Sequence, residues 1–215
     1  MASRALGVKT AGAAVSPWKP SSERARQREI KRDAVILAAA RAFRLRGYHN
    51  TSLDDLAALL NVTKPTIYHY LDNKEEILFE CFRTGLDQIK SAFDDIRDSK
   101  APAIERLTAV MRKYAEAITS EFGWCMVRAE DQDLSPVMSK RINTLKSEID
   151  QGIRRLIKDG IADGSIRRCD PKITAFALAG AMNWIAHWHR ADAELTPDQI
   201  ADRFIETFVN GLQPR

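Results

Sequence analysis

The stretch from Thr51 to Lys74 constrains this chain of 215 residues more than any other, because it combines two helix patterns with a tight turn between them. Ser52 is followed three residues later by Asp55, which is the spacing of a capping box, so we expect a helix to begin there. The apolar residues that follow recur at positions i, i+3, i+4 and i+7, and these are Leu53, Leu56, Ala57 and Leu60. This spacing predicts an amphipathic helix with one buried face.

The next residues predict a turn and the start of a second helix. Asn61 tolerates the left-handed conformation that ends many helices, and Val62 is expected to plug the turn. Thr63 is a suitable N-cap for the second helix. Pro65 fits its first turn, where the missing N–H has no intrahelical acceptor to lose.

The second helix is short and carries polar and aromatic residues on its outer surface. Ile67 and Leu71 are one turn apart and are expected to face inward, while Asn73 with Glu76 predicts the cap of a third helix. The side chains left outside are Lys64, Thr66, Tyr68, His69 and Tyr70. Two helices joined in this way, the second with an exposed polar surface, are typical of a helix-turn-helix that binds DNA.

This succession resembles the DNA-binding segment of the TetR family of bacterial transcriptional regulators. That segment has a helix after a Thr-Ser pair, then Val-Thr or Val-Ser, a short helix carrying Tyr, and Asn-Lys or Ser-Lys. The resemblance extends over residues 33–82, with Leu71 where the family usually has Phe. It implies that Lys64, Pro65 and Thr66 read bases, that Tyr68, Tyr70 and Lys74 contact phosphates, and that Ser52 heads the supporting helix near the DNA backbone.

Charge is distributed unevenly along the chain. Residues 1–74 hold 13 Lys and Arg against 6 Asp and Glu, whereas residues 75–215 hold 20 against 23. We expect residues 1–22 to form a disordered basic tail. Arg24, Arg26 and Arg28 then form a possible arm that enters the minor groove or follows the phosphates. The alternative, which stays open, is a solvated segment that acts only through long-range attraction.

The sequence beyond the helix-turn-helix is helical in its periodicity, and no segment alternates with period two. Helices are expected over about 74–97, 104–120, 136–161, 171–190 and 196–211, with a short one inside 123–136. The fold class is therefore all-α, with about nine helices. We expect a helix-turn-helix domain at residues 23–74 and an effector-binding and dimerisation domain at residues 75–215.

The last two long helices carry more apolar surface than one neighbouring helix can cover. Small residues permit close approach, and aromatic residues extend the same surface, so a dimeric four-helix bundle is expected. The predicted interface residues are Ala177, Gly180, Ala181, Trp188, Phe204 and Phe208. The resemblance implies the same homodimer, which would read a near-palindromic operator with half-sites about one DNA turn apart.

The middle helices are expected to enclose a small-molecule cavity that is mostly apolar. Its candidate lining residues are Met111, Tyr114, Trp124, Met126, Met138, Met182, Trp184 and His187. The C-terminal run GAMNWIAHWHR is similar to the subset of TetR proteins that sense acyl coenzyme A thioesters or related lipid catabolites. A flat, drug-like hydrophobic compound is the alternative effector.

Several classes of protein are disfavoured by what the sequence lacks. It has no run of about 18 apolar residues, so no membrane span is expected. Its three Cys residues are far apart, which fits the cytoplasm and gives no metal framework. His187 and His189 point about 200° apart on a helix and are poorly placed to share a metal ion. No catalytic motif and no cofactor-binding motif is present, so neither an enzyme nor a cofactor is expected.

These features together predict a cytoplasmic, nucleoid-associated transcriptional regulator, most simply a repressor released by a small molecule. Two alternatives from other classes are an architectural DNA-binding protein without an effector and an enzyme or carrier built on a helical bundle. The operator, the effector and the sign of regulation are not encoded in any motif.

Overall fold

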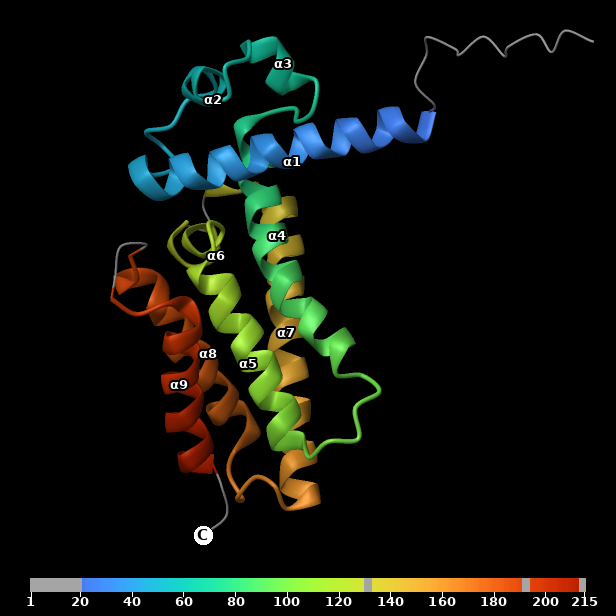
Figure 1. Cartoon of the computed structure of the whole chain (residues 1–215), viewed down its shortest axis with the longest axis vertical. Helices are drawn as coiled ribbons and strands as arrows, with labels where there is room; N and C mark the ends of the chain where they lie inside the picture. Colours follow the sequence, from blue (N-terminus) through green and yellow to red (C-terminus); the bar gives the residue numbers. More distant parts are fainter. Residues whose placement is uncertain (1–20, 130–132, 191–193, 213–215) are drawn as a thin grey trace, which may run out of the picture.

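The computed structural model describes residues 21–129, 133–190 and 194–212, and over these ranges it contains nine helices and no strand. The helices are α1 (Ser21–Arg46), α2 (Leu53–Leu59), α3 (Lys64–Tyr68), α4 (Lys74–Asp95), α5 (Ala103–Thr119), α6 (Gly123–Arg128), α7 (Pro136–Asp163), α8 (Pro171–Trp188) and α9 (Pro197–Leu212). In Figure 1, α1 to α3 form one end of the molecule, and α4 leads from them into the bundle of α5 to α9. The expectation of an all-α fold is confirmed.

The helix-turn-helix follows its local sequence signals closely. The N–H of Asp55 donates to Oγ of Ser52 (3.1 Å), and the N–H of Ser52 donates to Oδ2 of Asp55 (2.8 Å), so the predicted capping box is complete. Asn61 has φ of 52°, the left-handed conformation expected at the end of α2. Asn73 caps α4 by accepting from the N–H of Glu76 (2.8 Å). The chain therefore turns where its capping residues direct it.

Two details of the turn differ from expectation. Val62 does not plug the turn but is 38% exposed, whereas Ile67 and Leu71 are buried. Thr63 is the N-cap residue of α3, yet its hydroxyl makes no capping bond and lies instead 2.9 Å from the hydroxyl of Thr66. The first amides of α3 are thus left without the expected side-chain cap.

Helix α4 belongs to both ends of the molecule. Near its start, Ile77, Leu78 and Phe82 are fully buried, and they share a core with Ile36 and Phe43 of α1. Its second half packs against α5 and α7 in the bundle. A boundary between residues 74 and 75 stays a prediction, and the expected tail of residues 1–22 lies outside the described residues except for its last two, which belong to α1.

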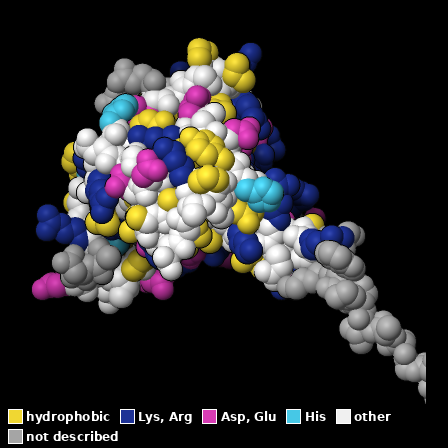
Figure 2. All heavy atoms as spheres, turned by 90° about the horizontal axis from the view of Figure 1, so that it is seen from above, with side chains coloured by type: hydrophobic (Ala, Val, Ile, Leu, Met, Phe, Trp, Pro, Cys, Tyr) yellow, Lys and Arg dark blue, Asp and Glu magenta, His cyan; other side chains and the backbone are white. Residues whose placement is uncertain are grey.

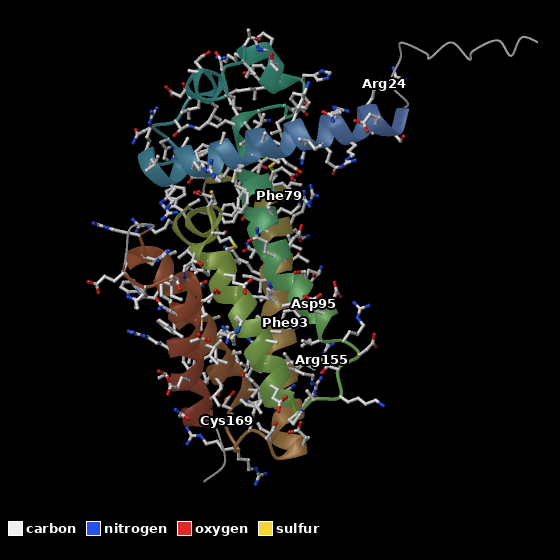
Figure 3. All side chains as sticks on the ribbon, viewed as in Figure 1. Arg24, Phe79, Phe93, Asp95, Arg155 and Cys169 are labelled. Atoms are coloured by element: carbon white, nitrogen blue, oxygen red, sulfur yellow. The ribbon has the colours of Figure 1, made fainter. Side chains whose placement is uncertain are left out.

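Close contacts fix the far end of the bundle. A Cβ atom on Gly152 of α7 would lie 2.5 Å from the ring of Phe93, which Figure 3 shows between α4 and α7. Gly164, with φ of +79°, ends α7 at the predicted turn. The turn then supplies Oδ2 of Asp163 to the N–H of Ala103 (2.8 Å), which caps the start of α5.

One face of α8 is apolar and exposed. Ile173, Trp184 and Trp188 are 62%, 62% and 41% exposed, and Ala177 and Gly180 lie exposed between them on the same side of the helix. We call these five residues the α8 apolar face. Nothing lies within 4 Å of the position that a Cβ atom on Gly180 would take. Large apolar side chains gathered in this way on a surface mark a contact area.

Candidate nucleic-acid interface and internal cavity

One side of α3 is buried against the protein, and the other side is accessible to solvent. Ile67 is fully buried and Leu71 is 1% exposed, so they anchor α3 against α2. Pro65, Thr66 and Tyr68 are exposed, and Lys64 and Tyr70 are half-buried. The structure therefore brings the predicted base-reading residues and Tyr68 together on one accessible surface.

Two of the predicted contact residues already have polar partners. Nζ of Lys64 lies 2.9 Å from Oδ2 of Asp54 on α2, and this hydrogen bond raises the pKa of the lysine. Ser52 donates its hydroxyl to Asp55 (2.6 Å) within the capping box. Both groups are at the surface, where such pairs are weak and can be exchanged for a phosphate oxygen.

The side chain of Lys74 is partly buried at the start of α4. Its Nζ atom lies 4.2 Å from the ring centroid of Tyr48 and 3.5 Å from the carbonyl oxygen of His49. Partial burial lowers the pKa of Lys74. Lys74 therefore ties the start of α4 to the segment after α1, and a phosphate contact by this residue stays a prediction.

The predicted basic arm is helical in the structure, and its contact with DNA stays a prediction. Arg24, Arg26 and Arg28 are exposed on the first turns of α1, which runs without a break from Ser21. Residues 21–46 contain neither Gly nor Pro, and Gln27 bonds Glu23 one turn earlier (3.2 Å), so helix formation prevails over charge repulsion. Figure 3 shows Arg24 at the projecting end of this helix.

A groove that the sequence did not indicate lies between α1 and the end of α3. Its lining residues are Arg24, Gln27, Arg28, Lys31, His69 and Tyr70, and we call it the α1 basic groove. Nη2 of Arg28 donates to the carbonyl of His69 across it (3.3 Å). In Figure 2, seen from the helix-turn-helix end, Lys and Arg side chains gather toward the side from which α1 projects. The positions 24, 27, 28 and 31 share one helix face, which is the signal that could have revealed it.

Polar contacts join this end to the bundle. Nε2 of His49 lies 2.8 Å from Oδ1 of Asp133, and the N–H of Ser135 donates to Oε1 of Glu75 (2.6 Å). The second contact lowers the pKa of the Glu75 carboxyl. Because Asp133 and Ser135 directly precede α7, both contacts tie the start of α7 to the helix-turn-helix end.

A cavity of about 500 Å³ lies inside the bundle, bordered by five helices from α4 to α8. Its apolar wall includes Leu86, Ile89, Ile118, Met126 and Ile149. Its polar lining residues include Tyr114, Lys146, Asp150, Arg154 and Asn183. An apolar chamber with a few polar groups is the usual form of a small-molecule site.

The polar groups of the cavity form two separate sets. On α7, Arg154 binds Asp150 at two points (2.6 and 3.1 Å), and its guanidinium carbon lies 5.0 Å from the ring centroid of Phe176. Lys146 adds a second positive charge to this set. On α5, the hydroxyl of Tyr114 donates to Oδ1 of Asn183 on α8 (3.0 Å). The α7 set is cationic, and the second set is neutral.

The structure places only two of the eight predicted ligand residues, Tyr114 and Met126, in this cavity. Met182 is fully buried in the core, and Met111 lines a small void beneath α9. Trp124 lines a separate polar recess beside His189, and Met138 is half-buried near the start of α7. Trp184 and His187 are exposed and stack on each other at 4.5 Å. The eight residues therefore do not share one pocket, and Trp184 and His187 lie outside because that face of α8 turns outward.

The predicted interface residues lie in two different environments. Ala177, Gly180 and Trp188 lie on the α8 apolar face, and Ala181 is half-buried at its edge. Phe204 and Phe208 of α9 are half-buried and pack against the core of the chain itself. Ala177, Gly180 and Trp188 are therefore the predicted interface residues that are exposed and available to a partner.

No three His, Cys, Asp or Glu side chains among the described residues are grouped as a metal site requires, and the three cysteines are free thiols. None of the described helices is long and apolar enough to cross a membrane.

Two family models match the chain. The model described as "Bacterial regulatory proteins, tetR family" matches residues 35–81, and the one described as "Tetracyclin repressor-like, C-terminal domain" matches residues 100–212. The first spans α2, α3 and their flanks, and the second spans α5 to α9. Both ends of the molecule are thus recognised independently.

Known proteins resemble nearly the whole chain. YhgD of Bacillus subtilis strain 168, an uncharacterized HTH-type transcriptional regulator, is 30% identical over 186 residues, which cover 85% of this chain and 97% of YhgD. The HTH-type transcriptional repressor KstR2 of Rhodococcus jostii strain RHA1 is 25% identical over 187 residues, covering 85% and 91%. The crystal structure of AibR in complex with isovaleryl coenzyme A and operator DNA has a TM-score of 0.72 and 30% identity, covering 85% and 98%.

Proposed function

The chain belongs to the TetR family of bacterial regulatory proteins, and we propose from this premise that it is a repressor released from its operator by an anionic, amphipathic effector. The transcriptional-regulator class follows from the family itself. The operator contacts, the dimer and the effector are proposals, and each is supported by a different part of the structure.

The operator-binding surface is α3 with its flanks. Lys64, Pro65 and Thr66 are accessible at the start of α3 and are assigned to base edges in the major groove. Tyr68, Tyr70 and Lys74, with Ser52 at the start of α2, are assigned to the DNA backbone. The α1 basic groove adds Arg24 and Arg28 as long-range or direct phosphate contacts.

The dimer is proposed to form through the α8 apolar face. Two copies related by a twofold axis bury Trp184 and Trp188, and the small residues Ala177 and Gly180 let the helices approach closely. Replacing Trp184 with Glu is expected to convert dimers to monomers in analytical ultracentrifugation, because an unpaired charge is costly in an apolar contact. A dimer as tight as wild type would refute this interface.

The effector is proposed to occupy the cavity of about 500 Å³, with its apolar part against Ile118 and Met126 and its anionic part toward Lys146 and Arg154. An acyl coenzyme A thioester has this combination of apolar chain and negative charge. The structure of AibR, which resembles this chain, contains isovaleryl coenzyme A and operator DNA together. The same class of ligand is therefore the first to test.

The observation that carries the proposal is the course of α4. This helix begins beside α3, where Asn73 caps it, and the same helix supplies Leu86 and Ile89 to the cavity wall. A ligand that prefers one position of α4 also prefers one spacing of the two α3 helices in a dimer. Release requires only that the effector bind the non-matching conformation more tightly, by a few kcal/mol.

The test is operator binding with and without effector. Purified protein is titrated into fluorescently labelled DNA from upstream of its own gene, and anisotropy is followed while isovaleryl or octanoyl coenzyme A is added. Specific binding that is reversed by a thioester, but not by free coenzyme A, is the expected result. Operator affinity that is the same with and without every thioester would refute the effector proposal while leaving DNA binding intact.

An architectural DNA-binding protein without effector control is the second candidate. It would be favoured if no small molecule bound in calorimetry, but the cavity and its polar sets give no structural reason to prefer it. We further propose that the chain acts in the cytoplasm at the nucleoid and catalyses no reaction, as a regulator of this kind requires neither a membrane nor an enzymatic step.

A further inference from the structure

The Tyr114–Asn183 pair is a neutral polar feature in a largely apolar part of the cavity. Tyr114 is 8% exposed, and its hydroxyl donates to Oδ1 of Asn183 (3.0 Å). Burial raises the pKa of Tyr114 to about 12, so the hydroxyl remains a donor at neutral pH. Polar groups in such surroundings are costly unless they are hydrogen-bonded. The mutual hydrogen bond offsets this cost for the Tyr114 hydroxyl and for Oδ1 of Asn183.

The pair has hydrogen-bonding capacity that the protein leaves unused. An Asn side chain carries two N–H donors in addition to its carbonyl oxygen. Within the described ranges, the hydrogen bond from Tyr114 is the one that Asn183 makes through its side chain, and the amide nitrogen donates to none of the described groups. With the Tyr114 hydroxyl donating to Oδ1, the two N–H donors of the Asn183 amide are not used by Tyr114. Asn183 lines the cavity, so this donor is available to a ligand.

The pair lies apart from Arg154 of the α7 set, whereas Asp150 of the same set is close enough to raise the pKa of Tyr114. Phe176, which Arg154 covers, and Asn183 are seven residues apart on α8, which corresponds to about 10 Å along the helix. A ligand whose charged group lies beside Arg154 can therefore present a different, uncharged group to Asn183. Ile118 lies one turn beyond Tyr114 on α5 and also lines the cavity, so apolar surface adjoins the pair.

We propose that Asn183 donates a hydrogen bond to a carbonyl oxygen of the effector, with Tyr114 as the positioning residue that orients the amide. For an acyl thioester this oxygen is the thioester carbonyl, which joins the apolar acyl chain to the polar remainder. The inference rests on the proposed effector function and adds the group that is recognised. A site built to bond a buried oxygen rejects analogues that lack it, because its donor is then left unpaired.

The test compares each thioester with the thioether in which a methylene group replaces the carbonyl. Isovaleryl and octanoyl coenzyme A and their thioether analogues are titrated into the full-length protein by calorimetry. Wild-type protein is expected to bind the thioesters about tenfold more tightly or better, since an unsatisfied buried donor is costly. Asn183→Leu should bind thioester and thioether equally, at the level of the thioether with wild type.

Two further variants separate recognition from a purely structural role. Tyr114→Phe keeps the ring and should reduce the discrimination only in part, because Asn183 stays but loses its orientation. Asn143→Leu makes the same replacement at an exposed position of α7 and should retain full discrimination. Operator affinity without effector, together with thermal melting, verifies that each variant is folded, and Tyr114→Phe alone suffices if Asn183→Leu does not fold.

Each outcome has one meaning. Equal binding of thioester and thioether by wild type, or full discrimination by Asn183→Leu, would overturn the carbonyl contact and leave the effector proposal standing. If neither compound binds wild-type protein, the acyl-thioester effector itself is wrong and this inference falls with it.

Discussion

The DNA-binding end and the cavity hold their polar groups in opposite ways. At α3, Lys64 pairs with Asp54 at the surface, where water and salt compete with the contact. In the cavity, the buried hydroxyl of Tyr114 pairs with the half-buried side chain of Asn183. Surface pairs can be exchanged for phosphates without much loss, whereas buried pairs keep one geometry and select their partner. Affinity adjustable by salt is thus expected at one end, and chemical selectivity at the other.

The largest expected effect separates the two ends. Ile67→Ala removes a fully buried anchor of α3 and should lower the free energy of unfolding of the helix-turn-helix end by about 2–5 kcal/mol. Specific operator binding should be lost, while thioester binding in calorimetry should remain, because no cavity residue is touched. Ile30→Ala, at a position that is 50% exposed, is the matched control. Loss of both activities together would mean that the ends do not fold separately.

Base reading should be visible as sequence preference. Thr66→Ala and Lys64→Ala are each expected to cost about 1–3 kcal/mol at the true operator while hardly changing binding to random DNA. Anisotropy titrations with both DNAs measure the difference. Equal losses on the two DNAs would remove these residues from base recognition and leave them only a role in general affinity.

The two ends also differed in how well the sequence predicted them. Ser52 and Asn73 accept from amides three residues later, and Asn61 takes a left-handed conformation within one residue, so these caps and turns were readable from spacing alone. The cavity combines residues from five helices, and which face of α8 turns inward depends on packing that spacing does not specify. Trp184 was therefore assigned inward although it is exposed, and Asn183, its neighbour, was missed.

The structure at the start of α1 was also difficult to predict from the sequence. Its arginines were assigned to an arm that precedes the first helix, but the helix propensity of Glu, Arg and Gln prevails there and the segment belongs to α1. The same arginines contribute to the α1 basic groove because their spacing places them on one helix face. The spacing of the residues in this segment therefore predicts its structure better than its charge does.

A smaller effect should be confined to the cavity. A Cβ atom on Gly85 of α4 would lie 2.5 Å from Sδ of Met126, so Gly85→Ala must displace that side chain, which lines the cavity. We expect effector binding to weaken by about 1 kcal/mol, or roughly fivefold, with operator affinity unchanged. Adding Met126→Ala should remove most of the coupling in a double-mutant cycle. Additive effects of the two changes would argue against this steric route.

Salt dependence should distinguish the two roles of Lys74. If it contacts a phosphate, Lys74→Ala weakens binding to every DNA sequence and lowers the salt slope by about one ion. Lys158→Ala, an exposed change on α7, is the control and should leave the slope unchanged. A wild-type slope in Lys74→Ala would show that the residue serves only its packing on Tyr48.

The smallest effect concerns the contact that joins the two ends. The N–H of Ser135 donates to Glu75 and lowers the pKa of that carboxyl, so the folded-state pKa lies below the unfolded one. Such a group stabilises the fold above the unfolded pKa, and the contribution is lost as the pH falls through the folded pKa. Glu75→Gln should therefore be less stable than wild type by under about 1 kcal/mol near neutral pH, because Glu75 lies at the surface. Urea unfolding at decreasing pH should show this difference shrinking in acid, and a difference that stays constant would mean that the charge of Glu75 does not strengthen the link between α4 and α7.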